Sequence, residues 1–467
     1  MLFSSIEFLY YFLPIVLILY FAVPFKFKNL VLLLSSLFFY FYGEPIYTFL
    51  MLGTTLSSYL HGLLIDKFRG KKLSKVFLAS SVVTSILVLG FFKYSDFFVS
   101  NINSLLNSDI ALLGLALPIG ISFYTFQTLS YTIDVYRGEA QVQKSFIRLA
   151  TYVALFPQLI AGPIVRYTTV EAELSNRKHS FENFSYGVNR FIIGLAKKVL
   201  IADTLAAMAS ALHGMTELTV GGMWLYSLAN YLNIYFDFSG YSDMAIGLGR
   251  IFGFHFLENF NYPFISKSVS EFWRRWHMSL GSWFRDYIYI PLGGNRVALP
   301  KWMFNTFVVW FVTGFWHGAD WTFIIWGLYF FVFLVMEKFF LQKWLNKLPK
   351  FASHIYVTVV IAISFVIFSG NGAKGMVADL SAMFGGQGLA FWSKETTYHL
   401  SGYAIALAVS LFGATPVLKN LMAKLHANEN SCRVMNVLEP IFHIVLLLIV
   451  TAYFVDGSFS PFLYFRF

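Results

Sequence analysis

The chain has 467 residues, of which 57% are hydrophobic, 20% aromatic and only 12% charged. An ordinary soluble domain carries about 25% charged residues, which form its hydrated surface. Together with a mean hydropathy of +0.64, this composition excludes a soluble globular enzyme and predicts a surface that faces a lipid bilayer. The one cysteine, Cys432, excludes disulfide frameworks, thiolate zinc sites and iron-sulfur clusters.

The net charge of +10 comes from 34 Lys and Arg against 24 Asp and Glu. Such an excess can indicate nucleic-acid binding, but here the basic residues are spread over short loops between apolar segments. That distribution is typical of the cytoplasmic loops of a membrane protein. We therefore expect a lipid bilayer around the chain and no nucleic-acid partner.

Apolar stretches recur from one end of the chain to the other. A spanning helix needs about 20 apolar residues, and several of these stretches are shorter or interrupted. We expect roughly ten to twelve crossings with some re-entrant segments, in a single transmembrane domain, 1–467, without an internal repeat. In chain order the stretches are 8–23, 30–42, 46–65, 76–92, 110–135, 147–165, 191–211, 222–252, 302–315, 321–336, 355–368, 403–417 and 440–455.

Clusters of Lys and Arg at 26–28, 67–75, 338–350 and 419–433 predict the cytoplasmic loops. The N-terminus then lies outside the cell. Because the last apolar stretch leaves the basic loop before it, the tail 456–467 is also expected on the outer face.

The stretch 258–296 differs from the rest, because arginines alternate with tryptophans and tyrosines. Helical spacing places Trp273, Trp276 and Leu280 on one face, and it turns Arg274, Arg275 and Met278 away from that face. We interpret this stretch as an amphipathic segment at an interface or along a cavity, and both arginines as candidates for substrate binding. A belt that only anchors the protein at the headgroups is the alternative.

His317 stands between two apolar runs that are flanked by Lys301 and Lys338. If both flanks are cytoplasmic, the runs form a hairpin too short to cross, with His317 at its tip inside the membrane. An ionisable group at that depth is by default a functional candidate. The alternative is a neutral histidine that is satisfied by one backbone carbonyl.

A second histidine, His277, lies in the arginine-rich stretch, and Gly314 and Gly318 beside His317 allow close approach of a ligand. Imidazole near neutrality can take a proton from a hydroxyl and return it to a leaving group. One histidine as base and the other as polariser therefore suit acyl transfer.

Other chemistries fit the sequence poorly. It contains no P-loop, dinucleotide-binding fingerprint, His-Glu-x-x-His or Gly-x-Ser-x-Gly motif, and we expect neither a metal site nor a bound cofactor. Asp237 is a polar group in an apolar setting. It is a candidate to line a substrate path, and a hydrogen bond between helices is the favoured alternative.

Eight segments, in order, resemble the membrane-bound O-acyltransferase family. The similarity is to its bacterial branch, which contains the alginate and peptidoglycan O-acetylation membrane proteins and the teichoic acid D-alanyl transfer protein. The segments are LPIGISFYTF (117–126), YTIDVYR (131–137), FPQLIAGP (156–163), YFDFSGYSDMAIG (235–247), ENFNYP (258–263), EFWRRWH (271–277), RDYIYIPLGGNR (285–296) and GFWHG (314–318).

The resemblance implies an all-α bundle of about eleven transmembrane helices with re-entrant segments and a central funnel. It places the two family histidines on His317 and His277, with Trp316 and Asn259 among the substrate-binding residues. His317 would be the general base, and His277 would position the thioester carbonyl or stabilise the oxyanion. The acyl group would pass from a cytoplasmic thioester such as acetyl-CoA to an acceptor on the far side.

The tail SPFLYFRF resembles the C-terminal aromatic motif of this branch, in which a tyrosine is proposed to carry the acyl group. Tyr464 is the matching position, and an aromatic anchor at the membrane surface is the alternative. The resemblance implies a bacterial cytoplasmic membrane protein with an extracytoplasmic acyltransferase partner and an envelope polysaccharide as acceptor.

Three other functions remain open from the sequence. A transporter or flippase of an envelope precursor would use the histidines as a proton relay. A structural scaffold would need neither histidine. Transfer of D-alanyl instead of acetyl groups is disfavoured by the tail motif. This motif is part of the present chain, whereas the family resemblance implies that the D-alanyl system supplies it on a separate small protein.

Overall fold

The computed structural model describes residues 1–457, and within this range the chain consists of helices, turns and irregular segments, without a strand. The predicted all-α class is therefore confirmed. The chain forms two compact units. Among the described residues, unit 1 contains 1–191 and 242–257, and unit 2 contains 192–241 and 258–457.

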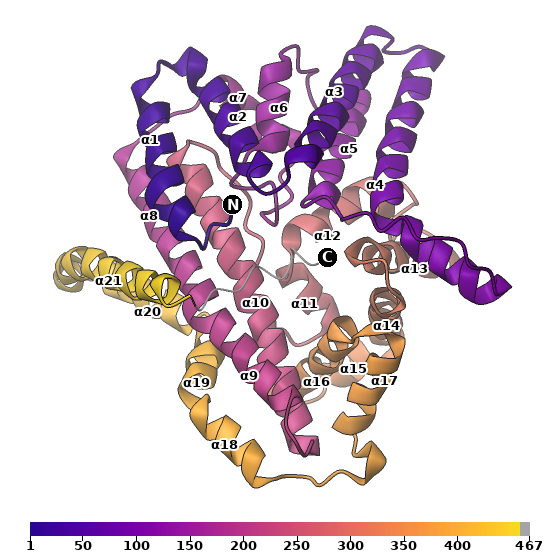
Figure 1. The fold of residues 1–467 in the computed structure, drawn as a ribbon, viewed down its shortest axis with the longest axis vertical. Coiled ribbons are helices and arrows are strands. Elements are labelled where there is room, and N and C mark those ends of the chain that lie inside the picture. The colour runs from indigo at the N-terminus through magenta and orange to yellow at the C-terminus, as the bar shows by residue number, and fades with distance from the viewer. Residues whose placement is uncertain (458–467) are drawn as a thin grey trace. The chain divides into compact units, whose positions relative to one another are not determined.

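Unit 1 is a helical bundle in which α3 packs against α2, α4, α5 and α6 (Figure 1). Prolines mark helix starts, because the ring suits the first turn: Pro24 precedes α2 and Pro45 begins α3. The helices are α1 (Leu13–Ala22), α2 (Phe25–Phe41), α3 (Pro45–Lys67), α4 (Lys72–Leu106), α5 (Ile121–Arg137), α6 (Phe146–Ala154), α7 (Tyr167–Ser175) and the first part of α8 (Phe181–Ala196).

Two predicted helical stretches of unit 1 are helical only in part. The chain is irregular before Ile121 and again after Ala154. Gly120 explains the first break, because it has φ +75 and a Cβ there would lie 2.8 Å from the Leu159 carbonyl oxygen. The irregular segment after α6 is buried, and the Phe156 ring packs on other aromatic rings of unit 1.

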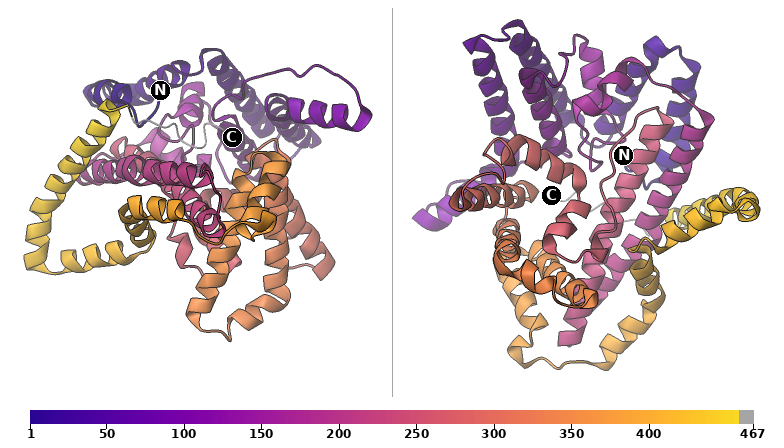
Figure 2. Two further views of the ribbon diagram at one scale, coloured as in Figure 1. Left: turned by 60° about the horizontal axis from the view of Figure 1, so that its bottom comes forward. Right: turned by 180° about the vertical axis from the view of Figure 1, so that it is seen from behind.

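Unit 2 contains the other helices, and the long helix α10 continues from it into unit 1. Helices α20 and α21 meet at their junction and run from it in different directions, as the left view of Figure 2 shows. The helices are α9 (Asp203–His213), α10 (Val220–Ile251), α11 (Val269–Arg275), α12 (Met278–Phe284), α13 (Leu299–His317), α14 (Trp321–Met336), α15 (Gln342–Leu345), α16 (Lys350–Ser369), α17 (Gly372–Met383), α18 (Lys394–Gly402), α19 (Ala404–Gly413), α20 (Val417–Ala427) and α21 (Glu429–Val455).

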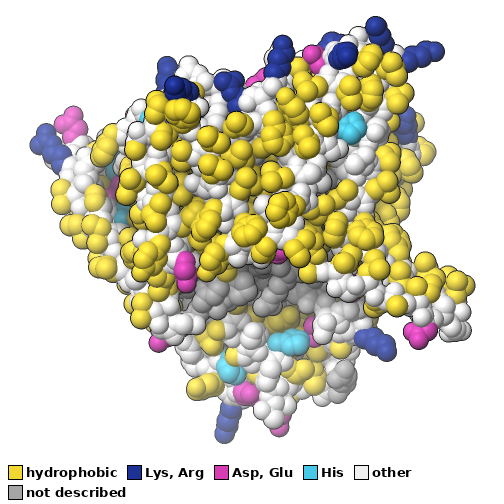
Figure 3. Space-filling view, turned by 45° about the horizontal axis from the view of Figure 1, so that its top comes forward, with side chains coloured by type: hydrophobic (Ala, Val, Ile, Leu, Met, Phe, Trp, Pro, Cys, Tyr) yellow, Lys and Arg dark blue, Asp and Glu magenta, His cyan; other side chains and the backbone are white. Residues whose placement is uncertain are grey.

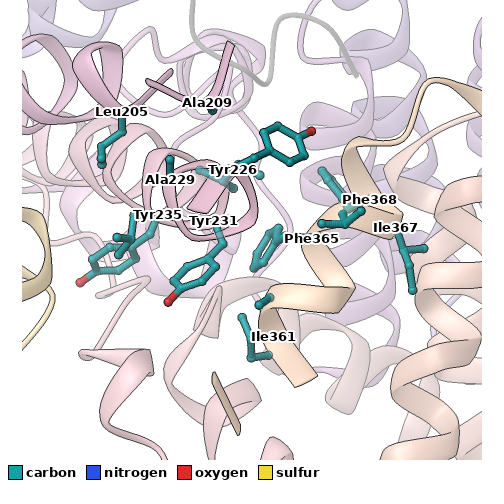
Figure 4. Close-up of a cluster of buried hydrophobic side chains, with 14 of the residues drawn as sticks. Leu205, Ala209, Tyr226, Ala229, Tyr231, Tyr235, Ile361, Phe365, Ile367 and Phe368 are labelled. Atoms are coloured by element: carbon teal, nitrogen blue, oxygen red, sulfur yellow. The ribbon is translucent and has the colours of Figure 1, made fainter. Parts of the chain in front are cut away.

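The hydrophobic core of unit 2 lies between α9, α10 and α16, with aromatic rings at its centre (Figure 4). The Tyr231 ring of α10 is 6.5 Å from the Phe365 ring of α16. One turn further along α10, the Tyr235 ring is 6.1 Å from the Trp276 ring. Through Trp276, this core supports the segment that carries His277.

Several helices are suited to cross a membrane. Among the described residues, α3, α4, α16, α21 and the helical stretch Trp321–Leu345 are long and apolar enough, and α19 with α20, bent by 63°, would make a sixth span. On the face in Figure 3, hydrophobic side chains cover most of the surface, and Lys and Arg stand mainly along its upper edge. The chain is therefore a multi-pass membrane protein.

The arginine-rich stretch is not one continuous amphipathic helix. It folds as two short helices, α11 and α12, which are separated at His277 by a left-handed backbone conformation with φ +46. This break overturns the predicted helical face, because the helical periodicity ends before it reaches α12. Trp276 is buried in the core of unit 2 and is not at a headgroup belt.

The two apolar runs around His317 form the neighbouring helices α13 and α14. The predicted shortness of both arms is wrong for the second one, because the helical stretch Trp321–Leu345 is long and apolar enough to cross a membrane. His317 is the last residue of α13, and α14 begins after Asp320, whose side chain accepts a hydrogen bond from the Thr322 N–H at 2.8 Å. The two helices pack closely at Gly314 and Gly327. A Cβ on Gly314 would lie 2.4 Å from the Phe323 carbonyl oxygen, so this glycine serves helix packing.

Replacing Gly327 is expected to separate α13 from α14, because a Cβ at this position would lie 2.3 Å from the Trp310 carbonyl oxygen. We predict that Gly327→Ala lowers the free energy of unfolding in detergent by roughly 1–3 kcal/mol, as overpacking does. Gly90→Ala in α4 is the control, because nothing lies within 4 Å of its added Cβ. Equal unfolding midpoints for the two variants would contradict the close packing.

Candidate active site

His317 lies in an aromatic cage at the end of α13. Its side chain is 6% exposed, and its ring centroid is 4.8 Å from Trp316, 4.9 Å from Trp326 and 5.3 Å from Phe368. The three rings come from α13, α14 and α16, all in unit 2. The imidazole is therefore surrounded by apolar aromatic side chains.

His277 is the second buried imidazole, 1% exposed. The Phe238 ring of α10 stands perpendicular to it at 4.7 Å, and the Trp316 ring lies 6.3 Å away. Trp316 therefore contacts both histidines. The structure brings together His277, His317 and Trp316, which the sequence proposed as site residues.

Asn259 holds the His277 ring from the other side. It is fully buried, and its Oδ1 atom lies 3.0 Å from His277 Nδ1 and 2.9 Å from the Ser279 hydroxyl. Backbone hydrogen bonds fix this geometry, because the Met278 N–H donates to the Asn259 carbonyl and the Asn261 N–H donates to the Arg275 carbonyl. Among the site residues named from the sequence, Asn259 is thus the one that orients a histidine.

Burial also sets the protonation state of His277. The ring lies between the short helices α11 and α12, outside the candidate spans. Loss of water around the cation lowers the pKa of His277 to about 3. The imidazole is therefore neutral at physiological pH and carries one ring N–H and one lone pair.

A cavity of about 550 Å³ lies beside α11 in unit 2. Its polar lining includes the basic side chains of Arg274 and Lys338, the amide of Gln342 and the carboxylate of Glu337. The indoles of Trp302 and Trp310 complete this part of the wall. The Lys338 ammonium stands 3.5 Å from the centroid of the Trp302 ring. Cations beside aromatic surfaces make this cavity suited to a ligand with anionic and planar groups.

An aromatic chain links the cavity to His317. Trp310, in the cavity wall, has its ring 6.4 Å from Trp326, whose ring packs on His317. Helix α11 forms another part of the cavity wall. At its N-terminus, the N–H groups of Val269 and Ser270 donate hydrogen bonds to the Glu337 carboxylate. A carboxylate is favourable at the N-terminus of a helix and anchors α11 there.

The two adjacent arginines have different surroundings. Arg274 lines the cavity. Arg275 forms an ion pair with Glu271 at 2.9 Å and donates a hydrogen bond to the Asn261 carbonyl. The structure therefore favours Arg274 as a ligand contact and Arg275 as a residue that stabilises the loop beside Asn259.

Asp237 lies in a buried ion-pair cluster. The Lys198 ammonium is 2.8 Å from carboxylate oxygens of both Asp203 and Asp237. Asp237 thus contributes to contacts between α10 and the π-helical turn Lys197–Ala202. Its neighbour Phe238 is the residue of this segment that reaches His277.

Some neighbours of the histidines were missed in the sequence, namely Phe238, Ser279, Trp326 and Phe368. Ser279 follows His277 by two residues, and this short spacing is the only local feature of the sequence that could have predicted their contact. Phe368 comes from α16, far along the chain. Tyr464, the proposed acyl carrier, lies outside the described residues. Within 1–457, no three His, Cys, Asp or Glu side chains cluster as metal ligands.

Comparisons with known proteins agree on one family. A model described as MBOAT, membrane-bound O-acyltransferase family, matches residues 136–377. The chain is 37% identical to a probable alginate O-acetylase of Pseudomonas putida over 100% of both chains. It is 34% identical to a peptidoglycan O-acetyltransferase of Helicobacter pylori over 86% of this chain and 83% of the relative. A teichoic acid D-alanyltransferase of Bacillus subtilis is 31% identical over 54% of this chain and 69% of the relative.

Removal of the buried cation at Lys198 tests whether the ion-pair cluster of Lys198, Asp203 and Asp237 stabilises the fold. Lys198→Met leaves Asp203 and Asp237 side by side without the ammonium between them, and loss of one partner from a buried pair costs about 3–5 kcal/mol. We predict a correspondingly lower unfolding midpoint in detergent. Arg69→Met is the control, because Arg69 pairs with Asp66 at the surface, where an ion pair contributes about 0–1 kcal/mol. Equal midpoints for the two variants would argue against the role of Lys198.

Proposed function

Because the chain belongs to the membrane-bound O-acyltransferase family, we propose that it transfers an acetyl group from a cytoplasmic thioester to an exported envelope polysaccharide. The chain is an acyltransferase by family, and its relatives are named for O-acetylation of alginate and peptidoglycan. The observation that carries the proposal is the pair of buried imidazoles, His277 and His317, in contact with one indole, Trp316.

The reaction needs one proton acceptor near the hydroxyl that attacks the thioester. In the proposed step, His317 takes the proton of the hydroxyl as the new oxygen–carbon bond forms. The carbon–sulfur bond then breaks, and the proton passes to the departing thiolate.

The cavity beside α11 is the proposed site of the donor. Arg274 and Lys338 supply positive charge for phosphate groups, and Trp302 and Trp310 supply surfaces on which a planar ring can stack. An acyl-CoA thioester carries both kinds of group and is the donor we propose. Lys338 belongs to the basic cluster for which a cytoplasmic position is expected, so the cavity would fill from that side.

We place the protein in the bacterial cytoplasmic membrane with both termini outside the cell. The basic clusters support this orientation through the positive-inside rule. Beyond the candidate spans, α13 and the shorter apolar stretch Glu7–Ala22 would contribute to a bundle of about eleven crossings and re-entrant segments around a funnel. Such a funnel would let donor and acceptor reach the histidines from opposite sides.

Transfer outside the cell would require a second protein. We propose that Tyr464 in the C-terminal tail accepts the acyl group and that an extracytoplasmic acyltransferase moves it onto the polysaccharide. The acetyl group is favoured over D-alanyl because the relatives named for O-acetylation align over more of this chain than the D-alanyltransferase of Bacillus subtilis. A transporter of envelope precursors would instead move its substrate without consuming a thioester.

Replacement of His317 tests the proposed base. We predict that His317→Ala lowers the rate of thiol release from acetyl-CoA by about 10²-fold or more, the range expected when acid–base catalysis is lost. The variant should still be monodisperse in detergent. His213→Gln is the matched control, because this half-exposed histidine pairs with Asp379 outside the aromatic cage. Near-normal thiol release in His317→Ala would refute the role of this residue.

Replacement of Tyr464 tests the acyl carrier. After incubation with acetyl-CoA, mass spectrometry should find an acetylated C-terminal peptide in the wild-type protein and none in Tyr464→Phe, which lacks the phenol oxygen. Tyr453→Phe in α21 should keep the label, because it removes a different exposed phenol. Acetylation of the tail in Tyr464→Phe would exclude this residue as carrier.

A further inference from the structure

The hydrogen bonds around Asn259 identify its oxygen atom. The backbone N–H of Ser279 points to the Asn259 atom assigned as Oδ1, at 3.3 Å. A backbone N–H can only donate, so the atom that it approaches must be the amide oxygen and not the amide nitrogen. The Ser279 hydroxyl donates to the same oxygen at 2.9 Å.

This oxygen determines which nitrogen of His277 carries the proton. His277 Nδ1 lies 3.0 Å from Asn259 Oδ1, and two acceptors at this distance would repel each other. Nδ1 therefore carries the hydrogen and donates to Asn259. Because burial keeps the ring neutral, the other nitrogen, Nε2, holds a lone pair.

The lone pair on Nε2 lacks a donor. Nε2 is buried and has no hydrogen-bond partner among the described residues. A buried acceptor without a donor costs free energy, and such a group in an active site is suited to bind a reactant that brings its own N–H or O–H. An acceptor cannot stabilise an oxyanion, so this geometry differs from the role that the family resemblance implies for His277.

We propose that His277, held by Asn259, recognises the acyl donor by accepting a hydrogen bond from the amide N–H next to its thioester. The inference rests on the proposed function and names the donor class as pantetheine thioesters. In these molecules two methylene groups separate the sulfur from an amide nitrogen. The thioester group itself has no hydrogen to donate, so this amide is the nearest donor to the reacting carbon.

The position of His277 favours the donor over the hydroxyl as its partner. Helix α11 lines the cavity through Ser270 and Arg274 and ends two residues before His277, so that Arg274 is three residues away from this histidine along the chain. A pantetheine arm that extends from phosphates near Arg274 would follow α11 toward the histidine. His317, whose ring packs on Trp316, remains available for the proton of the hydroxyl.

Asn259 is in this account a positioning residue. It does not touch a reactant, and it acts by fixing the orientation and tautomer of His277. Ser279 supports it with two hydrogen bonds, and the pairing of Met278 with the Asn259 carbonyl fixes the backbone. The left-handed conformation of His277 makes this arrangement possible, because it returns the chain toward Asn259.

The experiment compares two small donors with the full-length protein in detergent. One is S-acetyl-N-acetylcysteamine, which contains the thioester and the amide N–H. The other is its analogue with a methylene group in place of that N–H. Wild-type protein should use the amide donor with a kcat/KM about tenfold higher or more, the discrimination expected of a site built to bind an N–H.

Variants then assign this discrimination to the two residues. His277→Phe removes the acceptor and should bring the ratio of the two kcat/KM values close to one. Asn259→Leu should do the same, because it no longer fixes the tautomer. Asn259→Asp keeps an oxygen that accepts from Nδ1, so it should preserve most of the preference. Each ratio is measured within one protein, so partial loss of folded material does not change it.

The outcomes are separable. If wild-type protein consumes neither of these donors nor acetyl-CoA, the proposed function fails. If it consumes them without a preference for the amide, or if His277→Phe lowers both rates equally and keeps the preference, the inference is wrong and His277 has another role. A ratio near one in Asn259→Asp together with a normal ratio in Asn259→Leu would exclude Asn259 as the positioning residue.

Discussion

Burial of imidazole rings among aromatic side chains is the constraint on which the site depends. A ring nitrogen that is removed from water must find its hydrogen bond in the protein or in a reactant. Asn259 meets this need for one nitrogen of His277, and the other nitrogen is left with a lone pair in an apolar environment. His317 lies in a similar cage, and Trp316 joins the two rings. Apolar rings thus surround both histidines, and a polar partner for a ring nitrogen must come from the protein or from a reactant.

The sequence predicted the parts of this site that depend on local pattern. Apolar runs on both sides of His317 indicated a hairpin, and α13 and α14 form it. Ordered motifs predicted the family, which the comparisons confirmed. The same motifs pointed to His277 and Asn259, which the fold brings into hydrogen-bond contact. The all-α class followed from the recurring apolar stretches and the family resemblance, because a bilayer leaves few alternatives for the backbone.

Other features depend on tertiary contacts that no local pattern encodes. Helical periodicity across Trp273 and Trp276 predicted one amphipathic face, but the chain reverses at His277 because the backbone of Met278 pairs with Asn259. The ion pair of Asp237 needs Lys198, which lies far away in sequence. Phe368 reaches His317 only because α16 packs against α14. Close approach at Gly314 likewise serves a neighbouring helix, although the sequence suggested a ligand.

The central claim is that this chain itself carries out acyl transfer at the histidine pair. The most direct measurement uses acetyl-CoA labelled either in the acetyl group or in the adenine ring, with the purified full-length protein in vesicles that expose its cytoplasmic face. The account predicts that acetyl label becomes covalently bound to the protein while adenine label does not, with one free thiol released for each acetyl group bound. Absence of both thiol release and bound acetyl label would contradict it.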